Sequence, residues 1–292
     1  METLPQQHLG ADAKTASGNT KSTWLCTSDV DGTLVTAVGA IMPKRNKTAI
    51  ARFRSLGGQF TIASGRSAPS VAKLMDRLRL TDIPAIVLNG AGVFDSASGK
   101  MLRYHPIPKE GTALAFALCR KFPRVQFHVH RQHSTHFWNL HTTSFFASSI
   151  DRQPRHFHRS LADFPQDGWG KGIFYGSARS IIELRDYCRS LTNVPLSFME
   201  TSSISFEVLA PGVHKGSALL ELAELLGIDA EHTAAIGNYD NDAGLLACAA
   251  VTAAPSNSPE SFKALAQHIV STDAKGAVAD FLAILEDKLV QK

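Results

Sequence analysis

The sequence predicts an α/β fold, in which short parallel strands alternate with helices, interrupted by an inserted α+β segment. Short apolar runs that end in polar residues alternate with stretches of helical apolar spacing, both before residue 92 and after residue 203. Between these parts, aromatic and β-branched runs follow one another without that alternation. We therefore expect an α/β domain formed by residues 23–91 and 204–292, with an α+β cap domain at 92–203.

The first α/β part opens with a strand over Trp24–Ser28 and a helix over Pro43–Leu56, which begins at a proline and ends at Gly57–Gly58. A strand over Phe60–Ala63, a second helix and a strand over Ala85–Leu88 follow. Such short, mostly apolar strands, separated by helices, are typical of a parallel sheet that helices cover on both faces. The apolar face of the second helix consists of Val71, Leu74, Met75 and Leu78.

The inserted segment opens with a hairpin pattern, in which Val93–Asp95 and Met101–Tyr104 flank a turn. Further strands are expected over Val125–Val129, Thr135–Trp138 and Ile173–Tyr175, and helices near 111–121, 141–150 and 180–190. The stretch 151–168, rich in Pro, Arg and His, is expected to be a loop.

Seven histidines and two tryptophans stand out in this segment. We expect surface histidines, although a zinc site or a polar wall against the substrate remains an alternative, and the tryptophans either stack on a sugar or pack the cap. These residues are His128, His130, His133, His136, His141, His156, His158, Trp138 and Trp169.

The alternation of strands and helices returns in the last part of the chain. Strands are expected over Ser205–Leu209, over Thr233–Ile236, near Val251 and over Ile269–Ser271. Helices are expected over Ala218–Leu226, over 259–266 and at the end of the chain, where Val278, Phe281, Leu282, Leu285 and Leu289 have helical spacing.

The composition is that of an ordinary globular protein, with 44% hydrophobic and 19% charged residues. The net charge of +4 and the pI near 8.9 are mildly basic, and the basic residues are scattered, so we expect no nucleic-acid partner. No apolar run approaches about 18 residues, so we expect no membrane span. Residues 1–22 are polar and are expected to form a disordered leader.

The four cysteines form no CxxC pair and stand in apolar segments, so they are expected to be buried, reduced thiols. This pattern favours a cytoplasmic protein. The cysteines are Cys26, Cys119, Cys188 and Cys248.

Two carboxylates, Asp29 and Asp31, follow the first strand one residue apart. At about 4 Å, two unit charges repel by about 4 kcal/mol at an effective dielectric constant near 20, which argues against a packing role. A divalent cation between them, or a proton on one of them, removes that repulsion. A phosphoryl-transfer enzyme uses such a pair as nucleophile and proton donor, with Mg²⁺ to neutralise the phosphate.

Polar residues follow other expected strands as well, and ligand sites of open α/β sheets gather at the carboxyl ends of the strands. Ser64 and Gly65 offer a hydroxyl and close backbone N–H groups to phosphate oxygens. Lys215 precedes a helix, where an ammonium group and backbone N–H groups together favour an anion. At Asn89–Gly90, the amide either contacts the substrate or shapes the turn. The fourth such group, Asn238, Asn241 and Asp242, offers hard oxygen ligands for Mg²⁺.

Five pieces of the sequence, in this order, resemble the haloacid dehalogenase superfamily and specifically its Cof-like (type IIB) phosphatases. They are D-V-D-G-T-L, I-A-S-G-R, A-I-V-L-N-G-A, E-V-L-A-P-G-V-H-K-G-S-A-L and G-N-Y-D-N-D. The likeness covers roughly residues 24–288. It implies a Rossmann-like core with a C2-type cap that closes over the substrate. It also implies a Mg²⁺-dependent phosphatase, monomeric or homodimeric, that acts on a sugar phosphate or another small phosphorylated metabolite.

The resemblance also implies a role for each matching position. Asp29 resembles the nucleophile that forms an aspartyl-phosphate, and Asp31 resembles the general acid that later acts as the base. Ser64 and Lys215 would hold the transferring phosphoryl group. The expected substrate-binding residues are Gly65, Arg66, Asn89 and Gly90, and the expected metal ligands are Asp29, Asp31, Asn238, Asn241 and Asp242.

One position departs from the family pattern, because Gly237–Asn238 stands where the family has Gly-Asp. An amide oxygen binds Mg²⁺ without contributing charge, so we expect weaker metal affinity. Asn238 is also the sole support for an alternative, a non-catalytic phosphate-binding or regulatory protein on this scaffold. A phosphomutase, which shares the D-V-D-G-T start and a similar cap, is a second alternative.

Overall fold

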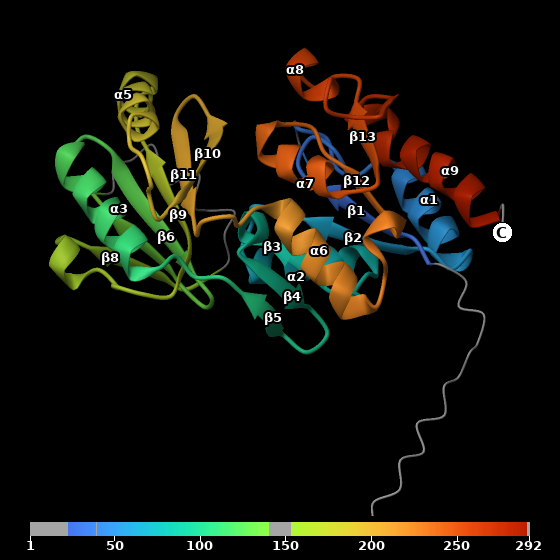
Figure 1. Ribbon diagram of the computed structural model, residues 1–292. Helices are drawn as coiled ribbons and strands as arrows, with labels where there is room; N and C mark the ends of the chain where they lie inside the picture. The colour runs from blue at the N-terminus through green and yellow to red at the C-terminus, as the bar shows by residue number, and fades with distance from the viewer. Residues whose placement is uncertain (1–22, 39, 140–152, 291–292) are drawn as a thin grey trace, which may run out of the picture.

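The computed structural model describes residues 23–38, 40–139 and 153–290, which fold around two β-sheets (Figure 1). The first sheet has eight strands in the order β14-β13-β12-β1-β2-β3-β4-β5, and the second has six in the order β10-β11-β9-β6-β7-β8. We call the part of the chain built on the first sheet the core and the part built on the second sheet the cap. Figure 1 shows them side by side, with the cap on the left.

The strands of the core are β1 (Leu25–Asp29), β2 (Gln59–Ala63), β3 (Ala85–Val87), β4 (Gly92–Asp95), β5 (Lys100–Tyr104), β12 (Thr233–Ile236), β13 (Val251–Pro255) and β14 (His268–Val270). Its helices are α1 (Lys44–Ser55), α2 (Ala68–Leu78), α6 (Lys215–Leu226), α7 (Ala243–Cys248), α8 (Glu260–Lys263) and α9 (Ala277–Val290). The strands from β14 to β3 run parallel, and every residue of β1, β12 and β13 is buried. Such burial is typical of a parallel sheet that helices cover on both faces. The predicted α/β fold is confirmed.

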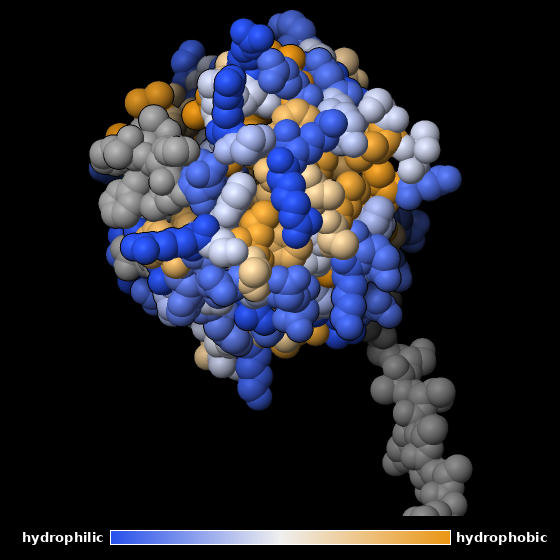
Figure 2. All heavy atoms as spheres, turned by 90° about the vertical axis from the view of Figure 1, so that its left-hand side faces the viewer, coloured by the Kyte–Doolittle hydropathy of each residue, from blue (hydrophilic) through white to orange (hydrophobic). Residues whose placement is uncertain are grey.

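The cap contains β6 (Gln126–Arg131), β7 (Thr135–Trp138), β8 (Arg155–His158), β9 (Trp169–Tyr175), β10 (Ser197–Ser202) and β11 (Ser205–Leu209), with α3 (Lys109–Lys121) and α5 (Ala178–Arg189). Alternate residues of its central strands, among them Phe127, Phe174 and Val208, form a second hydrophobic core with the two helices. Figure 2 views the molecule from the cap end, where hydrophilic side chains surround an apolar band. The other face of the cap sheet combines polar residues with the apolar Phe137 and Ile173, and it turns toward the core, since Lys171 on β9 contacts the core backbone.

Several expected elements differ from the structure. The hairpin β4–β5, expected in the cap from residue 92 onward, belongs to the core sheet, because β4 pairs antiparallel with β3. Conversely, β11, expected in the core, pairs with β9 and β10 in the cap sheet. The expected loop 151–168 contains β8, paired with β7, and β10 and α7 were not predicted.

Two predictions lie outside the described residues: the disordered leader at 1–22 and the helix near 141–150. Within the described residues, no helix has both the length and the apolar character needed to cross a membrane. All four cysteines are free; three are buried and Cys248 is partly buried.

Candidate active site

The polar residues predicted from the sequence gather at the carboxyl ends of three neighbouring strands. β1 ends at Asp29, β2 is followed by Ser64 and β12 is followed by Gly237, and β1 pairs in parallel with both other strands. A cavity of about 490 Å³ opens at this edge, between core and cap. Of the predicted residues, it is lined by Asp29, Asp31, Ser64, Gly65, Arg66, Asn89, Asn238 and Asn241. The cap lines it with His130, Lys171, Ile173, Tyr175, Thr201 and Glu207.

Lys215 lies next to this cavity and joins two carboxylates. Its Nζ donates to Asp29 Oδ1 at 2.5 Å and to Asp242 Oδ1 at 2.6 Å. Lys215 and Asp242 are fully buried, and Asp29 is 6% exposed. The ammonium group therefore fixes one oxygen of Asp29 and balances charge that water cannot screen.

The start of α6 places Lys215 in this position. The His214 side chain accepts hydrogen bonds from the backbone N–H groups of Gly216 and Ser217, and Ser217 Oγ accepts one from the His214 N–H. Gly216 lets α6 approach α7 closely, because a Cβ there would lie 1.9 Å from the Gly244 carbonyl oxygen. Lys215 is thus fixed by a capped helix end and a tight helix contact.

Burial shapes the protonation of this cluster. Burial raises the pKa of the Asp29 carboxyl above its ordinary value, the Asp242 carboxylate adds to this rise and Lys215 opposes it. Burial lowers the pKa of Lys215, but the carboxylates of Asp242 and Asp29 outweigh this effect and hold it above its ordinary value. Lys215 is therefore charged at neutral pH.

Asp31 lies at the mouth of the cavity and is held by Arg66. The guanidinium group donates from Nε to Asp31 Oδ2 at 3.0 Å and from Nη2 to Oδ1 at 2.5 Å, a bidentate geometry. Ser64 Oγ accepts a hydrogen bond from the Arg66 backbone N–H at 3.2 Å. Gly32 has φ +84° and lets the chain turn between Asp31 and the next residues. Arg66 thus orients a carboxylate that is still accessible from the cavity.

The side-chain amide of Asn238 lies close to three oxygen atoms, a grouping that is relevant to Mg²⁺ binding. One end of this amide lies 3.2 Å from Asp29 Oδ2, 3.3 Å from the Asp31 carbonyl oxygen and 3.2 Å from Thr33 Oγ1. When its nitrogen occupies this position, the amide donates to these oxygens. When its oxygen does, only the Thr33 hydroxyl can donate to it, and a cation would offset the repulsion from the oxygens of Asp29 and Asp31. Neighbouring oxygens around octahedral Mg²⁺ lie about 2.9 Å apart, near these separations. The residues therefore fit a magnesium ion.

The sequence predicts Asp242 as a metal ligand, but in the structure its two carboxylate oxygens accept hydrogen bonds from protein groups. Its Oδ1 accepts from Lys215, and its Oδ2 accepts from the backbone N–H groups of Asn238 and Tyr239 at 3.0 and 3.4 Å. With both oxygens engaged in this way, Asp242 orients Lys215 and the loop after β12. Asn241 lines the cavity, as noted above.

Asn89 and Gly90 shape the junction between core and cap. Asn89 is buried with φ +56°, and its Nδ2 donates to Glu207 Oε2 at 2.7 Å. Gly90 does not line the cavity; a Cβ there would lie 2.2 Å from the His214 carbonyl oxygen. Gly90 therefore permits close packing against the start of α6 rather than contact with a ligand in the cavity.

Sequence reasoning missed two charged residues of the cap, Lys171 and Glu207. Lys171 Nζ donates to the Gly65 carbonyl oxygen at 2.8 Å and to Glu207 Oε1 at 3.2 Å. Each is the one charged residue in an apolar strand pattern, W-G-K-G-I-F-Y and S-F-E-V-L. A charge inside such a run is the signal that could have identified them.

The expectation of surface histidines is wrong for two of them. His128 and His136 are buried, because they lie on β6 and β7 within the cap sheet. His136 Nδ1 lies 2.9 Å from His158 Nε2, and its ring stacks on that of His156. Trp169 is buried among the aromatic residues of the cap core, so it packs rather than lines the cavity. His141 lies outside the described residues.

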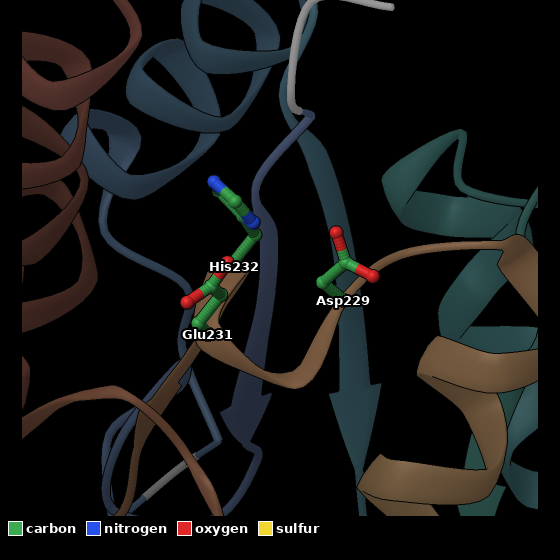
Figure 3. Close-up of side chains that lie close together, drawn as sticks. All are labelled: Asp229, Glu231 and His232. Atoms are coloured by element: carbon green, nitrogen blue, oxygen red, sulfur yellow. The ribbon is translucent and has the colours of Figure 1, made fainter.

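A second group of potential metal ligands lies elsewhere. Among the described residues, Asp229, Glu231 and His232 have ligand atoms within 4.8 Å of one another (Figure 3). They directly precede β12, at the amino end of a strand whose carboxyl end leads to Asn238. Asp229 and Glu231 are exposed, and exposed acidic groups are common without a bound ion.

The family model of haloacid dehalogenase-like hydrolases matches residues 26–282 of the chain. The 5-amino-6-(5-phospho-D-ribitylamino)uracil phosphatase YcsE of Bacillus subtilis is 26% identical over 257 residues, which cover 86% of this chain and 91% of that protein. A putative phosphatase of Streptococcus pyogenes is 25% identical over 261 residues, which cover 86% of this chain and 94% of that protein.

Solved structures share the fold. A haloacid dehalogenase-like hydrolase from Bacteroides thetaiotaomicron superimposes with a TM-score of 0.76 at 21% identity, covering 90% of this chain and 99% of its own. A subclass IIB sugar phosphatase of the same superfamily gives a TM-score of 0.77 at 19% identity, covering 92% and 100%. At these identities the likeness concerns the arrangement of core and cap.

Proposed function

The chain belongs to the haloacid dehalogenase-like hydrolases and is a phosphatase, and we propose that it hydrolyses a small phosphorylated metabolite through an aspartyl-phosphate, with Mg²⁺ as cofactor. The observation that carries this proposal is the pairing of Lys215 with Asp29 at the floor of the cavity. A buried carboxylate with one oxygen held by an ammonium group presents its other oxygen in a fixed direction, as a nucleophile requires.

In the first step, an Asp29 carboxylate oxygen forms a bond to phosphorus while the bond between phosphorus and the ester oxygen breaks. Asp31 donates its proton to the departing oxygen, which leaves as an alcohol. In the second step, water attacks phosphorus, Asp31 accepts a proton from that water, and the bond to Asp29 breaks to release phosphate. One residue thus acts as acid and then as base.

The transferring group carries negative charge that the site has to stabilise. Ser64 Oγ donates a hydrogen bond to one phosphoryl oxygen, and the Lys215 ammonium group balances the charge beside Asp29. Arg66 offers its guanidinium group at the mouth of the cavity, where a phosphoryl oxygen competes with Asp31 for it. Ser64 and Lys215 are in place before the substrate arrives, which lowers the cost of reorganisation.

Asp29, the Asp31 carbonyl oxygen and Asn238 are the residues that would hold Mg²⁺, which supplies positive charge to the phosphoryl oxygens. Asn238 contributes no charge to this set, so we expect weaker affinity than an aspartate would give. Asp242 accepts a hydrogen bond from Lys215 and so helps to hold its ammonium group in place.

The proposed substrate class is a sugar phosphate or a related hydroxylated phosphomonoester. The cavity is small and is lined largely by polar side chains of core and cap, which supports a compact, polar leaving group. The Bacillus subtilis relative, by its name, acts on a phosphorylated ribityl compound, which is also a phosphate ester rich in hydroxyls. Free cysteines, as in Cys26 and Cys119, are typical of a reducing compartment and support a cytoplasmic location.

The test is phosphate release from a panel of phosphomonoesters, with Mg²⁺ or with EDTA, by the wild type and by Asp29→Asn. We expect metal-dependent turnover that falls by at least about 10³-fold in the variant. Turnover that persists in Asp29→Asn would refute the aspartyl-phosphate. Turnover that is equal with EDTA would refute the role of Mg²⁺.

A further inference from the structure

Two buried charges lie on the face of the cap sheet that lines the cavity. Residues that share this face through strand pairing include Lys171, His130 and Glu207, whereas the opposite face is apolar and packs under α3 and α5. Lys171 is only 3% exposed and Glu207 only 7%. Apolar residues would pack there without the desolvation cost of two buried charges, so their presence at a cavity wall points to a binding role.

These two residues form a network with Asn89 of the core. Glu207 accepts hydrogen bonds from Lys171 Nζ on one oxygen and from Asn89 Nδ2 on the other, at 3.2 and 2.7 Å. Lys171 Nζ also donates to the Gly65 carbonyl oxygen at 2.8 Å. The network therefore crosses from cap to core at the cavity wall.

One acceptor atom of this network is unpaired in the part of the chain that the structure describes. Asn89 is 1% exposed, and its Oδ1 has no hydrogen-bond partner among the described residues. Lys171 Nζ lies within 3.2 Å of the Gly65 carbonyl oxygen and of both Glu207 carboxylate oxygens, so a hydroxyl that accepts from it shares the ammonium group with Glu207. A buried acceptor without a partner is costly and rare, and a ligand that donates to it removes this cost.

The network also lies beside the reacting centre. Gly65 directly follows Ser64, and a Cβ at Gly65 would lie 3.0 Å from both terminal atoms of the Asn89 amide. Asp29, Ser64, Asn89 and Lys171 line the same cavity, so the leaving group of a phosphate ester bound at Asp29 and Ser64 shares that cavity with Asn89 and Lys171.

We propose that Asn89, Lys171 and Glu207 bind a hydroxyl group of the leaving group close to the ester oxygen, and so determine which phosphate esters are accepted. The hydroxyl donates to Asn89 Oδ1 and accepts from Lys171 Nζ, while Glu207 fixes both side chains. This inference rests on the phosphatase function proposed above, and it identifies Lys171 and Glu207 as specificity-determining residues.

The test compares esters that differ only in hydroxyl groups, glycerol phosphate and propyl phosphate. We expect the wild type to prefer glycerol phosphate in kcat/KM by at least about 10-fold, because a site built for a hydroxyl rejects an analogue without it. Glu207→Gln should reduce this preference by about 10-fold, because it weakens the contacts that hold Asn89 and Lys171 in place for the hydroxyl. The matched control is Glu200→Gln, which alters a cap carboxylate that pairs with Arg185 outside the cavity.

A second measurement is independent of turnover. Calorimetric binding of both esters to Asp29→Asn, with and without Glu207→Gln, should show the same preference and its loss. An equal loss for both esters would overturn the proposal in favour of a cap–core contact alone, as would the absence of any preference in binding. If the wild type released no phosphate from any ester, the proposed function would fail, while the binding comparison would still decide the role of the network.

Discussion

Lys215 Nζ lies 2.5 Å from Asp29 Oδ1, and this contact joins two side chains 186 residues apart in the sequence. The same ammonium group reaches Asp242 at 2.6 Å, so one buried cation serves two buried carboxylates. Two ionised carboxylates at this depth are costly without such a partner, because water solvates neither of them fully. The contact therefore links the stability of the core to the orientation of the nucleophile.

Replacement of Lys215 by methionine should destabilise the protein strongly. Lys215→Met leaves Asp29 and Asp242 buried without their cation, and removal of one partner of a buried pair costs about 3–5 kcal/mol. The free energy of unfolding, measured with a chemical denaturant at pH 7, should fall by that amount. Lys263→Met is the control, because Lys263 pairs with the exposed Glu260 and such pairs contribute about 0–1 kcal/mol. Equal losses in the two variants would contradict this account.

Restoration of the aspartate at position 238 should strengthen metal binding. Asn238→Asp adds a negative charge next to Asp29 Oδ2 and the Asp31 carbonyl oxygen, and it removes the amide N–H groups that compete for them. We expect the Kd for Mg²⁺ to fall by about 10-fold, since affinity at such sites rises with the number of charged ligands. Calorimetric titration with Mg²⁺ measures this without any substrate.

The matched control is Asp240→Asn, which changes an exposed carboxylate of the same loop by the reverse substitution. It should leave the Kd for Mg²⁺ nearly unchanged. If Asn238→Asp and the wild type bound Mg²⁺ equally well, position 238 would not contribute to the metal site.

The predictable part of the fold depended on burial along each strand. β1, β12 and β13 are buried throughout, and their short runs of apolar and small residues identify parallel strands of a covered sheet. The sequence predicts the hairpin β4–β5 but assigns it to the cap, whereas it belongs to the core sheet. Its sequence does not encode which strand it pairs with; the antiparallel pairing of Ile86 with Val93 decides this.

Strand pairing also limits how many residues of the candidate active site the sequence can predict. Asp29, Ser64 and Asn238 follow strands directly, so local motifs were enough to propose them. Lys171 and Glu207 come together through the pairing of β9 with β11, in which Glu207 lies opposite Ile173. Such contacts depend on strand register and on which face of the sheet meets the core, and neither is visible in a single sequence.

The buried histidines of the cap should make its stability depend on pH. Burial lowers the pKa of His136 to about 4, and the nearby His156, His158 and Arg131 add to this effect. A histidine in the unfolded chain has a pKa near 6.5. The unfolded state therefore binds more protons between these values, so the stabilisation is complete above about pH 6.5 and is lost as the pH falls toward 4.

The measurement compares unfolding free energies of the wild type and His136→Gln between pH 7 and pH 5. The wild type should lose up to about 1.4 kcal/mol per pH unit more than the variant over this range. His133→Gln, which changes an exposed histidine of the same segment, should retain the wild-type slope. Identical slopes for the wild type and His136→Gln would show that His136 titrates alike in the folded and unfolded states.

The role of Asp31 should appear in how the rate depends on the leaving group. Asp31→Asn keeps the shape of the side chain and an oxygen for Arg66, which donates to Asp31 from Nε at 3.0 Å, but it removes the transferable proton. An alkoxide leaves poorly without a proton, so kcat for an alkyl phosphate should fall by about 10²–10⁴-fold. A nitrophenyl phosphate, whose phenolate leaves without protonation, should lose much less in the first step.

Both esters form the same aspartyl-phosphate, so a burst experiment separates the two steps at which Asp31 acts. In Asp31→Asn, nitrophenolate should be released in a burst equal to the enzyme concentration, followed by slow turnover, because the variant also lacks the base for the attacking water. If the alkyl and nitrophenyl esters were slowed equally and no burst appeared, Asp31 would act before the chemical step. Its bidentate pair with Arg66 would then matter for phosphate binding, since loss of that pair would weaken the hold on both esters alike.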